Sequence, residues 1–393
     1  MSTFPRRSNC RLPSARPNKS ARGNAVTPCY FDHNATTPPR PETVEAVSHA
    51  LGAWGNPSSV HSYGRAARRI VEDSRRHVGG LAGVDPAAVV FTSGGTEANN
   101  LALRGCGRAR ILVSAIEHLS VLEAANNIEL IPVDENGVVD LKALQATLGD
   151  GGDTVVSVML ANNETGVIQP VSRAAALAHE AGALFHCDAV QGAGRLKLDF
   201  STLGADLMTL SAHKIGGPKG AGALIAADHV QLGAINRGGG QERGRRSGTE
   251  NVPGIAGFGA AAEQASAEVA SAGNLAALRD RLEERVLAEI PGARIVGAGA
   301  ARLPNTSCIA LPGISAETQI MALDLAGFAV SAGSACSSGK VKPSHVLAAM
   351  GFDNDIAACA IRVSLGAGNS EADIEGFVAA YRDFAKRAGA TAA

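Results

Sequence analysis

The sequence predicts an α/β protein with two domains: a large domain around a doubly wound, mostly parallel sheet of seven strands, and a smaller α+β domain after it. Two observations support this prediction. First, short apolar runs alternate with longer helix-like stretches from Val44 onward, which is the pattern of strand–helix–strand units. Second, the apolar runs are continuous rather than alternating with polar residues, as expected for strands buried on both faces of a parallel sheet.

The expected elements follow one another along the chain. Candidate strands occupy residues 88–92, 110–114, 129–132, 154–160, 183–187, 207–211 and 222–225. Helix-like stretches lie between them at residues 97–103, 119–125, 141–147 and 172–181. An Ala-rich stretch at residues 252–290 predicts one long helix. After it, strands are expected at 306–311 and 361–364, with helices at 315–325, 343–350 and from residue 371.

The chain divides into four expected parts. Residues 1–28 form a disordered basic tail, residues 29–43 a segment that packs with the small domain, residues 44–290 the large domain, and residues 291–393 the small domain. The tail contains Arg and Lys but no acidic residue, and it is rich in Pro and Ser. That composition indicates disorder, although an Arg-rich, acid-poor start is also typical of an organelle transit peptide. The prolines argue against the amphipathic helix that a transit peptide forms.

The composition excludes several classes of function. The 36 Lys and Arg residues are balanced by 37 Asp and Glu residues, for a net charge of -1, so the chain lacks the overall basic field of a nucleic-acid-binding protein. No apolar run approaches the roughly 18 residues that a membrane helix needs. The seven cysteines contain no C-x-x-C pair, which argues against a zinc ribbon or a disulfide scaffold. Without an export signal, we expect reduced thiols and a cytoplasmic protein.

Lys214 and Asp188 each stand at or just after the end of an expected strand. Ligands of doubly wound domains bind at the carboxyl ends of the strands, so both side chains are candidates for a binding site. A desolvated lysine has a lowered pKa and can bond covalently to a carbonyl carbon, although most lysines in loops are simply solvated. A carboxylate there can pair with the pyridinium nitrogen of pyridoxal phosphate and keep its ring an electron sink, or it can merely cap a helix.

Further candidates lie at other strand ends. Gly95 and Thr96 stand in a Ser-Gly-Gly-Thr turn between a strand and a helix, where backbone N–H groups can bind a phosphate, although such turns are also common in packing. His118 could stack on a flat cofactor and transfer protons, or it could be a capping or core histidine. Asn163 could donate its amide to a ring oxygen, or it could belong to a turn of the kind that Asn and Gly favour.

Two residues of the small domain complete the set. Cys336 lies in a stretch made almost wholly of Ser, Ala and Gly, so its thiol is a candidate nucleophile. The alternative for any cysteine is a small apolar core residue, which we expect for Cys308 and Cys359. Arg362 lies in an apolar strand and needs an anion there, either the carboxylate of a ligand or a structural ion-pair partner.

In their order along the chain, these residues and their neighbours resemble the group I cysteine desulfurases of the NifS/IscS type. The similarity runs from about residue 30 to residue 385. It is carried by the segments 32–37 (Asp-His-Asn-Ala-Thr-Thr), 55–58, 92–97, 117–118, 162–164, 211–214, 238–240, 246–249 and 334–336, together with Asp188 and Arg362. The resemblance implies the PLP-dependent transferase fold of type I in the class V aminotransferase family, with pyridoxal 5′-phosphate as the cofactor.

The resemblance also implies a role for each matching residue. The cofactor would be bound by Gly95, Thr96, His118, Asn163, Asp188, Gln191, Ser211, His213, Lys214 and Thr249, the last from the second subunit of a homodimer. Lys214 would hold the cofactor covalently, and His118 would stack on its ring and transfer protons. Asn163 and Arg362 would bind the carboxylate of L-cysteine. Cys336 would take the sulfur as a persulfide while L-alanine is formed.

The implied activity is that of a sulfurtransferase in iron–sulfur cluster assembly. L-cysteine would be the substrate, and a scaffold protein of the NifU/IscU type would accept the sulfur. The segment 337–343 resembles NifS more than IscS, which favours nitrogenase-type assembly and a role in nitrogen fixation. No intrinsic metal site is expected, although Cys336 could contact a nascent cluster. The alternatives are a selenocysteine lyase, another class V aminotransferase, and a non-catalytic sulfur-trafficking scaffold with the same fold.

Overall fold

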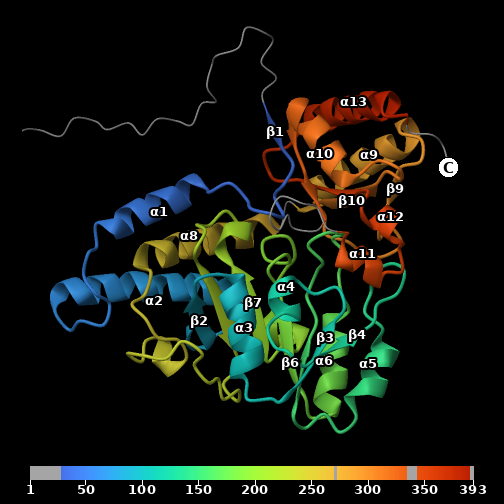
Figure 1. Cartoon of the computed structure of the whole chain (residues 1–393). Helices are drawn as coiled ribbons and strands as arrows, with labels where there is room; N and C mark the ends of the chain where they lie inside the picture. Colours follow the sequence, from blue (N-terminus) through green and yellow to red (C-terminus); the bar gives the residue numbers. More distant parts are fainter. Residues whose placement is uncertain (1–27, 270–271, 334–342, 390–393) are drawn as a thin grey trace, which may run out of the picture.

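The computed structural model of the chain describes residues 28–269, 272–333 and 343–389 (Figure 1). Its larger sheet has seven strands in the spatial order β2-β8-β7-β6-β5-β3-β4. These strands are β2 (Val89–Thr92), β3 (Arg110–Ser114), β4 (Ile128–Ile131), β5 (Thr154–Ser157), β6 (Leu184–Asp188), β7 (Leu207–Ser211) and β8 (Gly222–Ala226). Strand β8 is antiparallel to both of its neighbours and the other pairings are parallel. The prediction of a mostly parallel sheet is therefore confirmed.

The strands of this sheet are buried on both faces, as their continuous apolar runs predict. In β2, Val89 and Phe91 pack into a first apolar cluster, whereas Val90 packs into a second cluster on the opposite face. In β3, Ile111 and Leu112 divide between the same two clusters. Because successive side chains of a strand point to opposite faces, a strand whose two sets are both apolar needs helices on both sides of the sheet.

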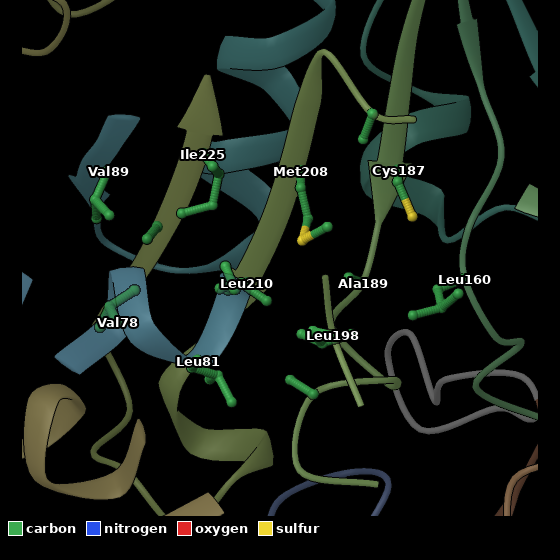
Figure 2. Close-up of a cluster of buried hydrophobic side chains, with 14 of the residues drawn as sticks. Val78, Leu81, Val89, Leu160, Cys187, Ala189, Leu198, Met208, Leu210 and Ile225 are labelled. Atoms are coloured by element: carbon green, nitrogen blue, oxygen red, sulfur yellow. The ribbon is translucent and has the colours of Figure 1, made fainter. Parts of the chain in front are cut away.

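Helices cover the two faces of the large sheet. Those that pack into the first apolar cluster are α2 (Ser62–Ala82), α5 (Leu141–Leu148), α6 (Val171–Glu180) and α8 (Val252–Glu268). Those on the opposite face are α3 (Gly95–Gly105) and α4 (Leu119–Leu122). Helix α1 (Pro41–Leu51) packs on α8, and α7 (Phe200–Leu203) connects β6 to β7. Figure 2 shows part of the first cluster, where Val78 and Leu81 of α2 lie beside Val89, Leu210 and Ile225 of the sheet.

A second, antiparallel sheet forms the core of the small domain, in the order β12-β13-β10-β9. Its strands are β9 (Arg294–Ile295), β10 (Thr306–Ala310), β12 (Ser331–Ala332) and β13 (Ala360–Ser364). Its helices are α10 (Ala316–Leu325), α11 (His345–Ala349), α12 (Asn354–Ala357) and α13 (Glu371–Arg387). The N-terminal segment also joins this part of the molecule: β1 (Cys29–Tyr30) pairs in parallel with β11 (Phe328–Ala329), and Phe31 lies in the same apolar core.

The stretch expected to be one long helix forms two helices that belong to different domains. Helix α8 ends at Glu268 and α9 begins at Ala272 and runs to Glu289. The buried face of α8 is rich in Ala and Gly and packs on α1 and α2, whereas Leu282 and Val286 of α9 lie in the core of the small domain beside α13 (Figure 1). Helix α9 therefore packs with the small domain, although it lies before the boundary expected after residue 290. Within the described ranges, no helix combines the length and apolar character needed to cross a membrane.

Candidate active site

The carboxyl ends of the parallel strands bring most of the predicted residues to one edge of the large sheet. Asp188 is the last residue of β6, and Lys214 ends the short 3-10 turn η2 (Ala212–Lys214) that follows β7. His118 follows β3, and Asn163 follows β5. Since β3, β5, β6 and β7 run parallel and side by side, residues that come from separate parts of the chain converge at this edge.

The amine of Lys214 is held by backbone oxygens and not by a carboxylate. Its Nζ donates to the carbonyl oxygen of Asn34 at 2.6 Å and to that of Ala35 at 2.9 Å, and no acidic side chain of the described residues forms an ion pair with it. Burial, followed by the nearby charges of Arg362 and Arg195, lowers the pKa of this lysine to about 7, against the opposite effect of Asp32 and Asp188. A large fraction of the amine is therefore neutral near pH 7, as a nucleophile requires.

The carboxylate of Asp188 is buried and fixed by two donors. Its Oδ2 accepts a hydrogen bond from the side-chain amide of Asn99 at 2.7 Å, and its Oδ1 accepts one from the backbone N–H of Val190 at 3.0 Å. Asn99 also contacts the hydroxyl of Ser120 at 2.8 Å, which holds the amide in place. Both bonds leave lone pairs on the carboxylate oxygens, so Asp188 is a preorganised acceptor for one further N–H group.

His118 caps the first turn of α4 and has a defined tautomer. Its Nδ1 accepts a hydrogen bond from the backbone N–H of Ser120 at 3.1 Å and lies 2.8 Å from the Ser120 hydroxyl. Because Nδ1 is the acceptor, the proton of the neutral ring is on Nε2. Burial lowers the pKa of His118, Asp188 raises it, and the charges of Lys214 and His345 lower it, which keeps the ring able to accept a proton. Thus its expected capping role and its expected site position are both present.

The predicted phosphate site lies at the N-terminus of α3. This helix has eleven residues, starts at Gly95 and follows Gly94, so its first N–H groups have no partner within the helix. A side chain at Gly95 would bring its Cβ to 3.2 Å from Val190 and 3.6 Å from the Cβ of Ser211, so only glycine keeps the space open. Thr96 is exposed and Ser211 is buried. These features form a cradle for an anion.

His213 lies in η2, two residues after Ser211, and contacts the N-terminal segment. Its Nδ1 is 3.2 Å from the hydroxyl of Thr36. Burial lowers the pKa of His213 to about 4, and the charges of Lys214 and Lys219 add to the effect. A neutral imidazole can donate one hydrogen bond to an oxyanion without adding a charge.

Arg362 meets the site from the small domain. Its NH2 group donates to Oδ1 of Asp32 at 2.7 Å, and its NH1 group donates to the backbone oxygen of Asn163 at 3.1 Å. The Nε atom is buried without a partner. The structural ion pair considered from the sequence therefore exists, and an unsatisfied donor remains beside it. Asn163 contributes its carbonyl oxygen to this contact rather than its side-chain amide, and the same oxygen accepts from Asn34 at 3.2 Å.

Gln191 lies at the same edge with both ends of its amide engaged. Its Nε2 donates to the carbonyl oxygen of Asn34 at 3.1 Å, and its Oε1 accepts from Arg195 at 2.7 Å. The carbonyl of Asn34 thus accepts from both Gln191 and Lys214. Asn34 is itself fixed by Thr306 at 2.9 Å and by Asn305 at 3.1 Å, so the N-terminal segment is tied to β10 of the small domain.

Two predicted residues are not brought into this group. Thr249 is exposed and lines a surface pocket with Trp54, Asn56 and Pro57, and that pocket contains none of the other predicted cofactor ligands. Cys336 lies outside the described residues, so its predicted role as the nucleophile stays a prediction. The expected apolar roles of Cys308 and Cys359 fit their complete or nearly complete burial.

Sequence reasoning missed several residues that shape the site. Asn34, Asn99 and Arg195 had no predicted role, although each touches a predicted site residue. Asn34 belongs to the Asp-His-Asn-Ala-Thr-Thr segment that carries the family resemblance, and Asn99 belongs to the segment after Thr96. Those segments were available signals. For Arg195 the sequence offered no such signal, because the contacts of this residue depend on how the turn after β6 folds back.

Together these residues fit pyridoxal phosphate. The cofactor has an aldehyde, a ring nitrogen, a flat ring and a phosphate, and the edge of the sheet offers a weakly basic amine at Lys214, a fixed carboxylate at Asp188, an imidazole at His118 and the anion cradle at Gly95. Lys214, Asp188 and His118 would hold the first three groups, and the N-terminus of α3 would hold the phosphate.

Comparison with known proteins supports the same assignment. Residues 29–377 match the family described as Aminotransferase class-V. A cysteine desulfurase of Cereibacter sphaeroides is 44% identical over 361 residues, which cover 88% of this chain and 92% of the relative. Cysteine desulfurase IscS 1 of Archaeoglobus fulgidus is 42% identical over 362 residues, covering 88% and 94%. The X-ray structure of a NifS-like protein from Rickettsia africae superposes with a TM-score of 0.85 at 37% identity and covers 91% of this chain and 99% of that protein.

These similarities confirm the fold and the family resemblance drawn from the sequence. The family uses pyridoxal phosphate, in agreement with the residues at the sheet edge. The chain is therefore a member of the class V aminotransferase family, and within it of the NifS/IscS-type cysteine desulfurases.

Proposed function

We propose that this protein converts L-cysteine to L-alanine and transfers the sulfur to its own Cys336 as a persulfide. The observation that carries the proposal is the convergence of Lys214, Asp188 and Arg362, which come from separate parts of the chain. An amine with a pKa of about 7, a fixed carboxylate and a guanidinium with an unpaired Nε are the groups that an amino-acid-processing pyridoxal phosphate enzyme needs. The names of the relatives supply the substrate.

Three residues of the large domain handle the cofactor and the proton. Bound pyridoxal phosphate supplies an electron sink for the bond that breaks at Cα. Lys214 first holds the cofactor and then, once released, takes the proton from Cα, for which its lowered pKa suits it. Asp188 would accept the ring N–H of the cofactor, and His118 would stack on its ring, where the Nε2–H and weak basicity of the imidazole would allow proton transfer.

Arg362 orients the substrate. A carboxylate that binds a guanidinium in two-pronged fashion needs two donors on one edge of the group. The unpaired Nε is one such donor, and the NH2 group now bonded to Asp32 is the other on that edge. The α-carboxylate of L-cysteine would therefore replace Asp32 on this edge of Arg362, while NH1 stays on the carbonyl of Asn163.

Sulfur transfer requires Cys336 near the bound substrate, and the residues on either side of its segment support this. Before it, Ser331 of β12 pairs directly with Arg362 of β13. After it, the Ser344 hydroxyl donates to the buried carboxylate of Glu164 at 2.5 Å. In the step itself, the Cβ–S bond of the substrate breaks, an S–S bond forms with the Cys336 thiolate, and the carbon takes up a proton to give alanine. The product on the enzyme is a persulfide.

Further parts of the proposal concern partners. We propose a homodimer, because exposed Trp54, Tyr63, Leu51 and Val60 gather in the segment that, with Thr249, lines or adjoins the surface pocket, and such apolar clusters favour association. Light scattering that gave a monomer would contradict this.

We also propose that the persulfide passes to an iron–sulfur scaffold protein of the nitrogenase type, in the cytoplasm. Capture of such a scaffold by the cysteine-loaded protein is the test.

The activity is tested by incubating the purified protein with L-cysteine and measuring alanine and protein-bound persulfide. Lys214→Ala should abolish both products and the yellow colour of the covalently held cofactor. Cys336→Ala should keep the colour and lose the persulfide, whereas the matched change Cys29→Ala at a half-buried thiol should do neither. Full sulfur release by Cys336→Ala would rule out the proposed acceptor.

The same assay separates the alternatives. Turnover of selenocysteine without turnover of cysteine would indicate a selenocysteine lyase. A keto acid in place of alanine would indicate an aminotransferase. Failure to bind pyridoxal phosphate at all would favour a non-catalytic scaffold.

A further inference from the structure

A buried guanidinium without an acidic partner lies behind the site. Arg195, in the turn after β6, is only 8% exposed. Its NH1 group donates to the carbonyl oxygen of Gln191 at 2.8 Å and to Oε1 of the same residue at 2.7 Å, and its NH2 group lies 3.4 Å from the carbonyl oxygen of His33. No Asp or Glu in the described ranges forms an ion pair with Arg195. This is unusual, because buried charges in proteins are normally paired.

The first consequence concerns the orientation of Gln191. A guanidinium has donors only, so it must face the oxygen of the amide and not its NH2 group. The contact with Arg195 therefore directs Nε2 of Gln191 the other way, toward the carbonyl of Asn34 beside Lys214. Without Arg195, only the carbonyl of Asn34 would still select this orientation of the amide, and Oε1 of Gln191 would lose its donor.

The second consequence concerns the charge balance around Lys214. The charged groups that act on it are Arg362 of β13, Arg195, Asp32 of the N-terminal segment and Asp188 of β6. Arg362 is paired with Asp32. Arg195 has no such partner among the described residues, so no ion pair neutralises its positive charge, and Asp188 is the remaining charge that opposes its effect on Lys214.

The neighbouring imidazoles complete this electrostatic environment. His118 and His213 also interact with the charge of Lys214. Burial and Arg362 lower the pKa of Arg195 to about 10, so its guanidinium stays charged at neutral pH. Arg195 is, after burial and Arg362, a cause of the lowered pKa of Lys214.

We propose that Arg195 is a positioning residue of this active site: it fixes the amide of Gln191 with its donor toward the cofactor, and it adds a positive charge without an ion-pair partner to the surroundings of Lys214. Both effects serve the same end. The fixed donor suits the negatively charged ring oxygen of bound pyridoxal phosphate, and the charge disfavours a proton on the nitrogen of Lys214. The inference rests on the roles proposed above for Lys214 and Gln191.

The test uses the holoenzyme and the absorbance of the cofactor bound to Lys214, which changes when the lysine nitrogen gains a proton. Arg195→Met removes the charge and keeps the volume, and Arg195→Lys keeps the charge. We expect Arg195→Met to raise the midpoint of the absorbance titration by about one pH unit, the size of effect that a nearby charge produces. Arg195→Lys should stay within a few tenths of a unit of the native midpoint, as should Arg173→Met, which removes an exposed arginine on α6.

A native titration midpoint in folded Arg195→Met protein would overturn the role of the charge. If that variant does not fold, as judged by circular dichroism, Arg195→Gln is measured instead.

The orientation of Gln191 is tested by a double-mutant cycle on the affinity for pyridoxal phosphate. Arg195→Lys should lose several-fold in affinity with Gln191 present and almost nothing in a Gln191→Ala background. Equal losses in the two backgrounds would overturn the positioning role. No cysteine turnover is needed for either measurement. This inference can therefore fail while alanine is still produced, and it can hold in a protein that produces no alanine.

Discussion

The two sides of the active site are held together in different ways. On the side of the large domain, His118 is fixed by Ser120 and Asp188 by Val190, each two residues further along the chain, and Asp188 also by Asn99 of α3 in the same domain. On the other side, Arg362 bonds to Asp32 and to Asn163, which are 330 and 199 residues away in sequence. The first set can be ordered by contacts within the large domain alone. The second exists only when the N-terminal segment, the turn after β5 and β13 have come together.

This difference has a functional consequence. Groups that are fixed locally keep their geometry whether or not a substrate is present, and preorganised groups act mainly on the chemical step. Groups that depend on long-range contacts can exchange partners when a ligand arrives, and they act mainly on affinity. The large-domain side should therefore control kcat, and the small-domain side should control KM.

The largest effect is expected for Asp188→Asn. The amide has nearly the same shape, but it replaces an oxygen acceptor and its negative charge, so the ring nitrogen of the cofactor loses its charged partner. We expect kcat for alanine formation to fall at least a hundredfold, a typical cost of losing one preorganised electrostatic contact, while KM for L-cysteine changes by only a few-fold. Steady-state kinetics measure both constants.

The outcome of that experiment also decides whether the two sides are independent. If Asp188→Asn raised KM as strongly as it lowered kcat, the large-domain side would not act on chemistry alone. The cofactor absorbance of the variant is the control, because a variant without bound cofactor reports on binding and not on catalysis.

The next largest effect is expected for Arg362→Lys. Lysine keeps the charge but loses the planar pair of donors that a carboxylate engages. We expect KM for L-cysteine to rise about ten- to a hundredfold, corresponding to the loss of a charge-assisted, two-pronged contact, with a smaller change in kcat.

Asp32→Asn is the matched variant on the same side. It removes the charge that now competes for Arg362, so KM should stay within about threefold of the native value or fall. An increase as large as that of Arg362→Lys would show that Asp32 orients the guanidinium and does not give way to substrate.

The same contrast explains what could be predicted from the sequence. A strand end is visible in the local pattern, and parallel strands bring their ends together, so Lys214, Asp188 and His118 could be placed at one edge of the sheet; their roles there stay predictions. Asn34 and Arg195 were missed, because their contacts join segments that no local pattern relates.

The single long helix expected over residues 252–290 was wrong for a similar reason. Helices α8 and α9 are both Ala-rich and adjacent in sequence, and composition alone made them look continuous. What separates them is the surface on which each one packs. Helix α9 packs on α13 and the small sheet, whereas α8 packs on α1 and α2. A short window of sequence shows neither of these packing partners.

The smallest effects are expected on stability in acid, where one buried histidine from each side can be compared. His186 of β6 is bonded at both nitrogens, to Ser157 at 2.8 Å and to Thr209 at 3.0 Å. His33 packs edge-on against Tyr30, with ring centroids 5.1 Å apart, and its Nδ1 is buried without a partner. Burial lowers the pKa of both rings to about 4, with Arg195 adding to the effect on His33 and Asp188 opposing it for His186.

Because the pKa of each ring in the folded protein lies below its usual value near 6.5, the unfolded chain binds more protons between about pH 4 and 6.5. The free energy of unfolding must therefore fall as the pH drops through this window, and it recovers above it.

His33→Phe removes one such group and an unpaired nitrogen. The variant should therefore lose about 1–3 kcal/mol less of its free energy of unfolding between pH 6.5 and 4 than the native protein does, at little cost at neutral pH. His186→Phe should remove a similar acid loss but destabilise the protein at pH 7 by about 1–3 kcal/mol, since it leaves two buried hydroxyls unpaired. Urea unfolding at several pH values measures both, and equal costs at pH 7 would mean that the small-domain side holds its histidine as specifically as the large sheet does.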